Sequence, residues 1–343
     1  MSGLALVTTT IQVPEVLARY REIGPGVPFF VTGDQQSPHD DIRRFCAGIG
    51  NTVYYSVAEQ EQLGYACSPV IGWKTTGRRN LAMLEAARHG ADAIVMIDDD
   101  NIPADDRYFA ALEEALLGAP FSGLELAGEG GWADPGALMT PPVRHRGFPH
   151  ELWHPVKPPV FGHASGVRPG VAAGLWLGDP DVDAVTRIAS QPSCMGVSAV
   201  ADAGCVLRPG TWAPFNSQNT AFRTELLPAM VMLSPAQRYD DIWASFIAER
   251  VMRECGWVVR YGRPYVWQQR NAHRLARDLS RELRGMSQTL AFCAELDRAQ
   301  IPAGADAADA ARAVFLHLAR GTRWEDIGNL GLTWQGDIKK AMA

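Results

Sequence analysis

Residues 93–101 read AIVMIDDDN, a short apolar run followed by three aspartates and an asparagine. The run Ala93–Ile97 is typical of a central strand in a parallel sheet, which is buried on both faces. Ligands of open α/β sheets gather at the carboxyl ends of such strands. Because adjacent carboxylates repel one another, a divalent cation would relieve the repulsion. The stretch therefore predicts Mn²⁺ or Mg²⁺ held by Asp98, Asp99 and Asp100, but an acidic loop before the next helix explains these aspartates equally well.

Strand and helix patterns alternate on both sides of this stretch. We expect strands over residues 4–7, 27–32, 171–177 and 257–261, and helices over 14–20, 78–89, 105–117 and 241–255. Such alternation is typical of an α/β fold with a mostly parallel sheet and helices on both faces. Thr8–Thr10 would form a turn after the first strand. Residues 118–170 are rich in Gly, Pro, Trp and His without periodicity, which predicts a long irregular wall or lid.

The C-terminal part of the chain has a helical pattern. Leucines recur at helical spacing after residue 274, and an alanine-rich helix is expected over 305–320. A chain of 343 residues suits one large domain with an appendage. We therefore predict one α/β domain over residues 1–269, which would hold the functional site, and a helical extension over 270–343.

Composition and charge exclude several classes of protein. Hydrophobic residues make up 47% and charged residues 20% of the chain, so it is neither disordered nor fibrous. The formal net charge of −6 provides no general basic field and argues against a nucleic-acid partner. No window approaches the roughly 20 apolar residues that span a bilayer, and residues 1–13 lack the basic segment of a signal peptide. Six cysteines without a CxxC pair favour free thiols. We therefore expect a cytoplasmic protein without a membrane partner.

Two further groups of polar residues follow predicted strands or begin predicted helices. Asp34 ends the second strand, where its carboxylate could accept hydrogen bonds from a ribose or a base, or form a simple Asx turn. Lys74, Arg78 and Arg79 stand at the entry to a helix. A helix amino end with guanidinium groups suits a pyrophosphate, although a solvated helix start has the same composition.

A last polar group lies in the second half of the chain. Asn219 begins the stretch NTAFR, and Asp240 and Asp241 begin a predicted helix. Paired aspartates at such a position are often plain N-caps, but in a cleft one of them could act as a general base or orient an acceptor hydroxyl. The spacing does not decide between these roles. GxSxG, HExxH, Walker and GxGxxG motifs are absent from the sequence.

The order of these motifs resembles a GT-A glycosyltransferase. More narrowly, the chain is similar to the reversibly glycosylated polypeptide family, which includes the plant UDP-arabinopyranose mutases. The likeness runs over roughly residues 4–285. It is carried by IDDDN (97–101), RGFP (146–149), GLWLGDPDVDA (174–184), NTAF (219–222), LLPAM (226–230), RYDDIWASF (238–246) and RPYVW (263–267).

The resemblance implies a nucleotide-sugar site with a metal at Asp98–Asp100. It assigns Asp34 to the nucleoside, and Lys74 and Arg79 to the diphosphate. The nucleotide-sugar-binding set is completed by Thr8, Thr9, Arg78, Asp98 and Asn219. The family's glycosylated arginine falls on Arg146, and the reacting end of the site falls on Asp240 and Asp241. Where relatives carry a histidine after the P-Y-aromatic stretch, this chain has Gln268, and His273 is the expected substitute metal ligand.

We predict first a metal-dependent glycosyltransferase that moves a sugar from a nucleotide-diphosphate donor, expected to be UDP-linked, to a small-molecule acceptor. Catalytic roles fall on Asp240, Asp241 and Arg146. The first alternative is a UDP-sugar pyranose/furanose mutase, which the arginine of RGFP supports. The second alternative is a non-catalytic nucleotide-sugar-binding protein. Association into a homo-oligomer is compatible with all three.

Overall fold

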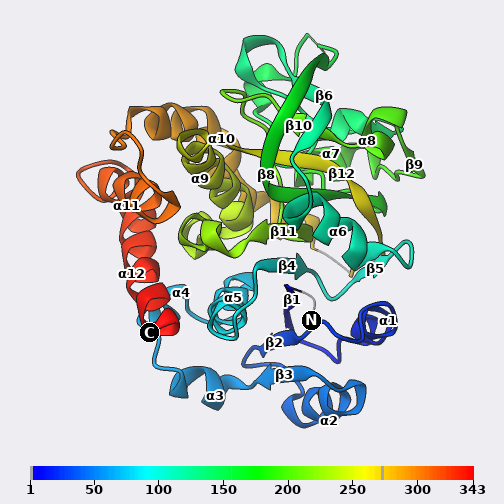
Figure 1. Ribbon diagram of the computed structural model, residues 1–343, viewed down its shortest axis with the longest axis vertical. Coiled ribbons are helices and arrows are strands. Elements are labelled where there is room, and N and C mark those ends of the chain that lie inside the picture. The colour runs from blue at the N-terminus through cyan, green and yellow to red at the C-terminus, as the bar shows by residue number, and fades with distance from the viewer. Residues whose placement is uncertain (1–2, 156, 272–273) are drawn as a thin grey trace.

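The computed structural model describes residues 3–155, 157–271 and 274–343. It confirms an α/β fold built on a ten-stranded sheet with the strand order β3-β2-β1-β4-β11-β8-β6-β10-β12-β5. Helices α5 (Arg79–Arg88) and α9 (Asp240–Cys255) lie on one side of this sheet, and α1 (Val16–Ile23) and α6 (Tyr108–Leu117) lie on the other (Figure 1). The predicted helices on both faces are therefore present.

The strands of the large sheet are β1 (Leu4–Thr10), β2 (Phe29–Gly33), β3 (Thr52–Tyr55), β4 (Ala93–Ile97), β5 (Asn101–Pro103), β6 (Phe121–Ala127), β8 (Val160–Gly178), β10 (Cys205–Leu207), β11 (Asn219–Arg223) and β12 (Trp257–Gln268). The short strands β7 (Met139–Thr140) and β9 (Gly196–Val197) form a separate pair. The remaining helices are α2 (His39–Ile49), α3 (Val57–Gln62), α4 (Cys67–Ile71), α7 (Ala184–Ser190), α8 (Ala199–Ala203), α10 (Leu275–Arg298), α11 (Ala307–Leu318) and α12 (Glu325–Met342).

The N-terminal half of the sheet is parallel. Strand β1 pairs in parallel with β2 and with β4, and β2 pairs in parallel with β3. All five residues of β4 are buried, as the continuous apolar run predicts. The carboxyl ends of β1, β2 and β4 therefore meet at one edge of the sheet, directly before Asp34 and Asp98.

The predicted turn at Thr8–Thr10 is wrong, because β1 continues to Thr10. Thr8 is buried, and its hydroxyl donates to the carbonyl of Ile97 at 2.9 Å. Threonine is β-branched and fits a pleated strand well, so three successive threonines extend the strand.

The prediction of irregular structure over residues 118–170 is wrong at the two ends of this segment, where β6 and the first half of β8 pair in an antiparallel manner. Between them, residues 128–155 and 157–159 contain only short helical turns and the two-residue strand β7, so this middle part is irregular as predicted. Both faces of β8 are largely exposed between residues 160 and 168, so the segment has no burial period that a sequence pattern could reveal. The second half of β8 is buried and contains the predicted strand 171–177.

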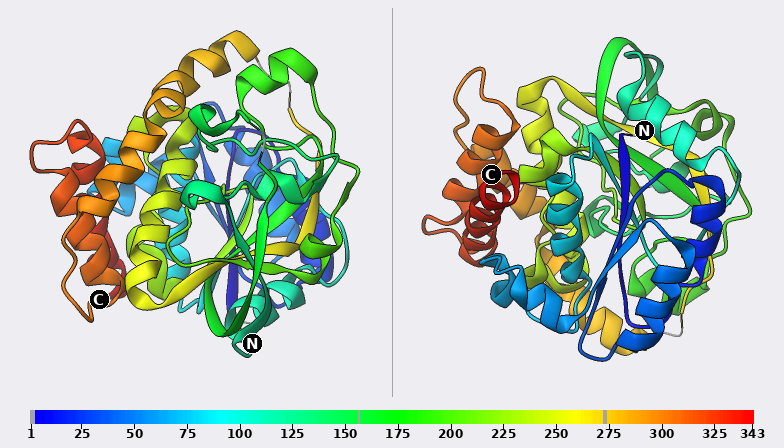
Figure 2. Two further views of the ribbon diagram at one scale, coloured as in Figure 1. Left: turned by 90° about the horizontal axis from the view of Figure 1, so that it is seen from above. Right: turned by 60° about the horizontal axis from the view of Figure 1, so that its bottom comes forward.

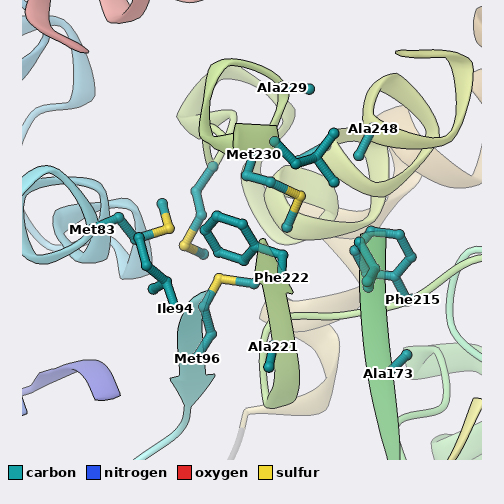
Figure 3. Close-up of a cluster of buried hydrophobic side chains, with 14 of the residues drawn as sticks. Met83, Ile94, Met96, Ala173, Phe215, Ala221, Phe222, Ala229, Met230 and Ala248 are labelled. Atoms are coloured by element: carbon teal, nitrogen blue, oxygen red, sulfur yellow. The ribbon is translucent and has the colours of Figure 1, made fainter. Parts of the chain in front are cut away.

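The centre of the core lies where β4 and β11 meet the helices beside them. Met83 of α5, Ile94 and Met96 of β4, Phe222 of β11 and Met230 point toward one another and are all buried (Figure 3). Methionine side chains fill irregular gaps around an aromatic ring, which suits this junction between strands that run in opposite directions.

The predicted C-terminal helices are present as α10, α11 and α12. They gather on one side of the sheet beside α9 (Figure 2). The indole Nε1 of Trp334 donates to the carbonyl of Leu227 at 2.9 Å. The carboxylate of Asp337 accepts the backbone N–H groups of Ala66 and Cys67 at 2.8 and 2.7 Å. These contacts anchor the end of the chain both to the segment after β11 and to the start of α4. Among the residues described, no helix is long and apolar enough to cross a membrane.

Candidate nucleotide-sugar site

A pocket of about 1010 Å³ lies at the carboxyl ends of β1, β2 and β4. The starts of α9 and α10 close its other side. A volume of this order is typical of a site for a ligand larger than a single sugar ring. The predicted residues that line it are Thr9, Asp34, Lys74, Arg79, Asp98, Asp99, Asp100, Arg146, Asp240 and Asp241. The fold therefore brings together groups that are up to 232 residues apart in sequence.

Asp34 fixes the loop that carries Lys74. Its carboxylate accepts the backbone N–H of Lys74 at 2.7 Å and that of Thr75 at 3.3 Å. Lys74 has a positive φ of 61°, a conformation that side-chain-bearing residues adopt at a cost unless the surroundings hold them. These two hydrogen bonds provide that restraint, so Asp34 shapes the pocket wall at the predicted nucleoside end.

The three aspartates have different partners. Asp98 forms an ion pair with Arg79, whose guanidinium also donates to the carbonyl of Ser217 at 2.8 Å. Asp99 accepts the hydroxyl hydrogen bond of Thr10. Asp100 Oδ1 is buried and has no hydrogen-bond partner in the described part of the chain. Burial, with the charges of Asp98 and Asp99, raises the pKa of Asp100 to about 7.

These carboxylates fit a metal site that is completed by substrate phosphates, and not one built from protein ligands alone. In residues 3–155, 157–271 and 274–343, no three His, Cys, Asp or Glu side chains are grouped to hold a metal ion. A ready-made protein cage is therefore not present among them. Mg²⁺, however, is usually held by one or two carboxylates together with substrate phosphates. The unpartnered oxygen of Asp100 suits that arrangement. His273 lies outside the described residues.

Arg146 stands between two buried carboxylates. Its guanidinium donates to Asp181 at 2.9 and 3.0 Å and to Asp241 at 3.1 Å through two nitrogens, and it also bonds the carbonyl of Arg238. All five N–H groups of the guanidinium therefore have an acceptor. Burial alone would lower the pKa of Arg146, but the charges of Asp181 and Asp241 raise it well above its usual value.

Asp240 is the titratable neighbour of this cluster. It is buried in the first turn of α9, and its Oδ2 accepts the hydroxyl hydrogen bond of Thr76 at 2.8 Å. Burial and then the charge of Asp241 raise the pKa of Asp240 to about 7. A carboxyl group with this pKa can both accept and return a proton near neutral pH.

Comparison with known proteins finds a family that part of this chain resembles. Residues 155–323 match the family model described as reversibly glycosylated polypeptide. The resemblance predicted from the motifs is confirmed, and five of the quoted stretches lie wholly inside the matched region: those at 174–184, 219–222, 226–230, 238–246 and 263–267.

Individual proteins similar to this chain carry a consistent name. UDP-arabinopyranose mutase 3 of Arabidopsis thaliana is 34% identical over 143 residues, which cover 38% of this chain and 38% of the relative. Probable UDP-arabinopyranose mutase 1 of Pisum sativum is 33% identical over 132 residues, which cover 37% of this chain and 35% of the relative. The chain thus matches little more than a third of the length of these relatives.

These names correct the leading functional prediction. A glycosyltransferase that passes its sugar to a small-molecule acceptor is wrong as the main interpretation, because the relatives are named as mutases. The order of GT-A motifs could not separate the two, since both activities need a site for a nucleotide sugar.

Three predicted binding residues lie outside the pocket lining. The hydroxyl of Thr8 holds β1 to β4. Arg78 is fully buried, where it donates to Gln60 Oε1 at 2.8 Å and lies over the ring of Trp73. The side chain of Asn219 is fully hydrogen-bonded inside the sheet. Its Nδ2 donates to the carbonyls of Leu175 and Pro264, and its Oδ1 accepts the hydroxyl hydrogen bond of Tyr108. All three side chains therefore support the pocket from behind.

Several residues that line the pocket are not among those predicted from the sequence. Asp181 lies in GLWLGDPDVDA, where only the resemblance marked the stretch. Four arginines also line the pocket, at positions 270, 274, 277 and 281. Their steps of four, three and four residues are the spacing of one helix face, a signal that the sequence does contain.

Proposed function

We propose that this protein is a mutase that interconverts the pyranose and furanose forms of a UDP-linked pentose. The similarity of the chain to proteins named UDP-arabinopyranose mutase supports this activity. The observation that carries it in the structure is Asp240, a buried carboxyl group with a pKa raised to about 7 that faces the same pocket as the aspartate triplet. Ring interconversion needs one movable proton and no acceptor molecule.

The bond changes define what Asp240 has to do. When a pentopyranose becomes a furanose, the bond between C1 and the ring oxygen O5 breaks and a bond between C1 and O4 forms. The proton on O4 is lost and O5 gains one. The UDP group leaves C1 with its bonding electrons and returns afterwards. Asp240, when ionised, accepts the proton from O4 and then delivers it to O5, so the protein ends the cycle unchanged.

We assign Arg146 to the positioning of Asp181 and Asp241. Every N–H group of Arg146 is already donated, and its pKa is raised, so the guanidinium stays protonated in this arrangement. It holds the two carboxylates beside the pocket, where their charge stabilises the positive charge that develops at C1 as the diphosphate leaves. Glycosylation of Arg146 would require these hydrogen bonds to break.

Asp98 and Asp100 are the residues that we propose for holding Mn²⁺ or Mg²⁺. When bound, such an ion neutralises the charge of the departing diphosphate. Replacing Asp100 with Asn is expected to weaken UDP binding in the presence of Mn²⁺ by about tenfold, because a charged ligand becomes neutral. Calorimetry measures this change. The matched control is Asp105→Asn, at an exposed ion pair with Arg263. Equal UDP affinity in both variants would argue against the metal assignment.

The activity is tested with UDP-arabinopyranose and no added acceptor. We expect UDP-arabinofuranose to accumulate until the two isomers reach equilibrium, as followed by chromatography and by the anomeric proton signals in NMR spectra. The reverse reaction from the furanose should reach the same ratio. Release of free arabinose and UDP alone, or no change in either direction, would contradict the proposal.

A further inference from the structure

The first turns of α10 and the segment just before this helix carry arginine side chains that have no role in the proposed reaction. We propose that Arg270, with Arg274, Arg277 and Arg281, forms a second anion site that binds the diphosphate of the nucleotide sugar without needing the metal. This inference rests on the proposed nucleotide-sugar site and names the part of it that grips the phosphates.

Arg270 is the strongest observation. Its side chain is only 8% exposed and lines the pocket. Its Nε and one terminal nitrogen have no hydrogen-bond partner among the described residues. The nearest carboxylates, Asp179 and Asp181, stand at 3.7 and 3.8 Å, beyond hydrogen-bond distance. A buried guanidinium without hydrogen bonds is costly, so a ligand that accepts from it would remove that cost.

The backbone sets Arg270 beside the aspartate triplet. Strands β12 and β5 pair so that Gln268 lies opposite Asn101, and the N–H of Gln269 donates to the carbonyl of Asp100 at 3.2 Å. Arg270 follows directly. One ligand can therefore reach both the carboxylates and the guanidinium, and a diphosphate has enough oxygens to contact a metal ion on one side and an arginine on the other.

Three more arginines extend this positive surface along α10. Arg274, Arg277 and Arg281 are exposed and line the same pocket, and their side chains form no hydrogen bond or ion pair within the part of the chain that is described. Other arginines nearby are paired: Arg238 binds Glu282 at 2.9 Å, and Arg284 binds Asp326 at 2.7 Å. Among the described residues of α10, the arginine side chains left unpaired are thus the ones that face the pocket.

The chemistry of these groups selects a phosphate ligand. Guanidinium groups present paired N–H donors that match two oxygens of a phosphate, and several of them together suit a group with more than one negative charge. Away from α10 the pocket wall is rich in aspartates, which repel anions, whereas Asp278 of α10 is paired with Arg238 at 3.7 Å. The diphosphate should therefore lie at the α10 side, with the sugar directed toward Asp240.

The test measures UDP binding by calorimetry in EDTA, so that no metal contributes. We expect Arg270→Gln to weaken binding by about tenfold, since hydrogen bonds to a charged group are lost. The triple variant Arg274→Gln, Arg277→Gln, Arg281→Gln should weaken it less at low salt and should reduce its dependence on ionic strength. Uridine, which has no phosphate, should bind the wild type and all variants alike. Inorganic pyrophosphate should displace UDP from the wild type.

Arg298→Gln, at the far end of α10 and outside this pocket, is the matched control and should bind UDP as the wild type does. Should Arg270→Gln fail to fold, the triple variant carries the test, because its side chains are exposed. Wild-type UDP affinity and salt dependence in the folded variants, or equal losses for UDP and uridine, would overturn the inference. A protein that binds UDP through these arginines but leaves UDP-arabinopyranose unchanged would contradict the mutase proposal and leave the anion site standing.

Discussion

Replacing Arg146 with methionine is expected to lower the free energy of unfolding by about 3–5 kcal/mol, because it leaves the buried carboxylate of Asp241 without its cation and that of Asp181 with only Arg270, at 3.8 Å. Asp181 and Asp241 are 1% and 8% exposed, so water cannot take over the role of the guanidinium. Methionine has a similar length and keeps most of the packing. Denaturation with urea at pH 7, followed by fluorescence of the tryptophans, measures the loss.

The matched control is Arg43→Met. Arg43 also makes a two-pronged contact with one carboxylate, at 3.0 and 2.8 Å to Glu59, but this pair is exposed. Its loss should change the free energy of unfolding by no more than about 1 kcal/mol. Adding Asp181→Asn and Asp241→Asn to Arg146→Met should recover part of the stability, since the uncompensated charges disappear. Similar losses for Arg146→Met and Arg43→Met would show that the buried cluster does not depend on this cation.

The parts of the fold that the sequence predicts are those with a strong local pattern. Strand β4 is a continuous apolar run, and both of its ends are placed correctly. Helix α9 has apolar residues at helical spacing and a terminal Gly256, and its predicted start differs by one residue. Asp34 and Asp98 were found because the carboxyl ends of parallel strands share one edge of the sheet.

The other half of the pocket depends on pairings that no local pattern reveals. The ends of β8 and β12 lie side by side, with Gly178 opposite Gln268. This register brings Asp181 and Arg270 into the same pocket, although 89 residues separate them in the chain. It depends on a strand whose first half is exposed on both faces and has no period. Asp181 therefore came only with the family resemblance, and Arg270 was not found.

Replacing Asp240 with asparagine is expected to slow ring interconversion by about 10²–10⁴-fold, the usual contribution of a general acid–base group. Asparagine keeps the shape of the side chain but cannot carry the proton from O4 to O5. UDP affinity should stay close to that of the wild type, because Asp240 acts at the sugar. The interconversion rate and the UDP dissociation constant are measured on the same preparation. A slow variant that also loses UDP affinity to the same extent would point to a damaged pocket.

The pH dependence follows from the raised pKa of Asp240. The carboxyl must be ionised to accept the O4 proton, so the wild-type rate should rise with pH and level off above about 7. Because the folded pKa lies above the unfolded value of about 3.9, the folded state holds the extra proton between these values. Asp240 therefore costs stability progressively as pH rises from about 4 to 7. Asp240→Asn should remove both the rise of the rate with pH and this decrease of stability with pH.

A substitution at Thr76 should shift this rising limb of the pH–rate profile without removing the carboxyl group of Asp240. Its hydroxyl donates to Asp240 Oδ2 at 2.8 Å, and this hydrogen bond lowers the pKa of Asp240 against the larger effects of burial and Asp241. Thr76→Val keeps the size of the side chain but removes the donor, so the pKa of Asp240 should rise and the limb should shift to higher pH, while the rate on the plateau changes little. A limb that stays in place in Thr76→Val would mean that another group controls the pH dependence, and Asp240 would lose its role as the proton carrier.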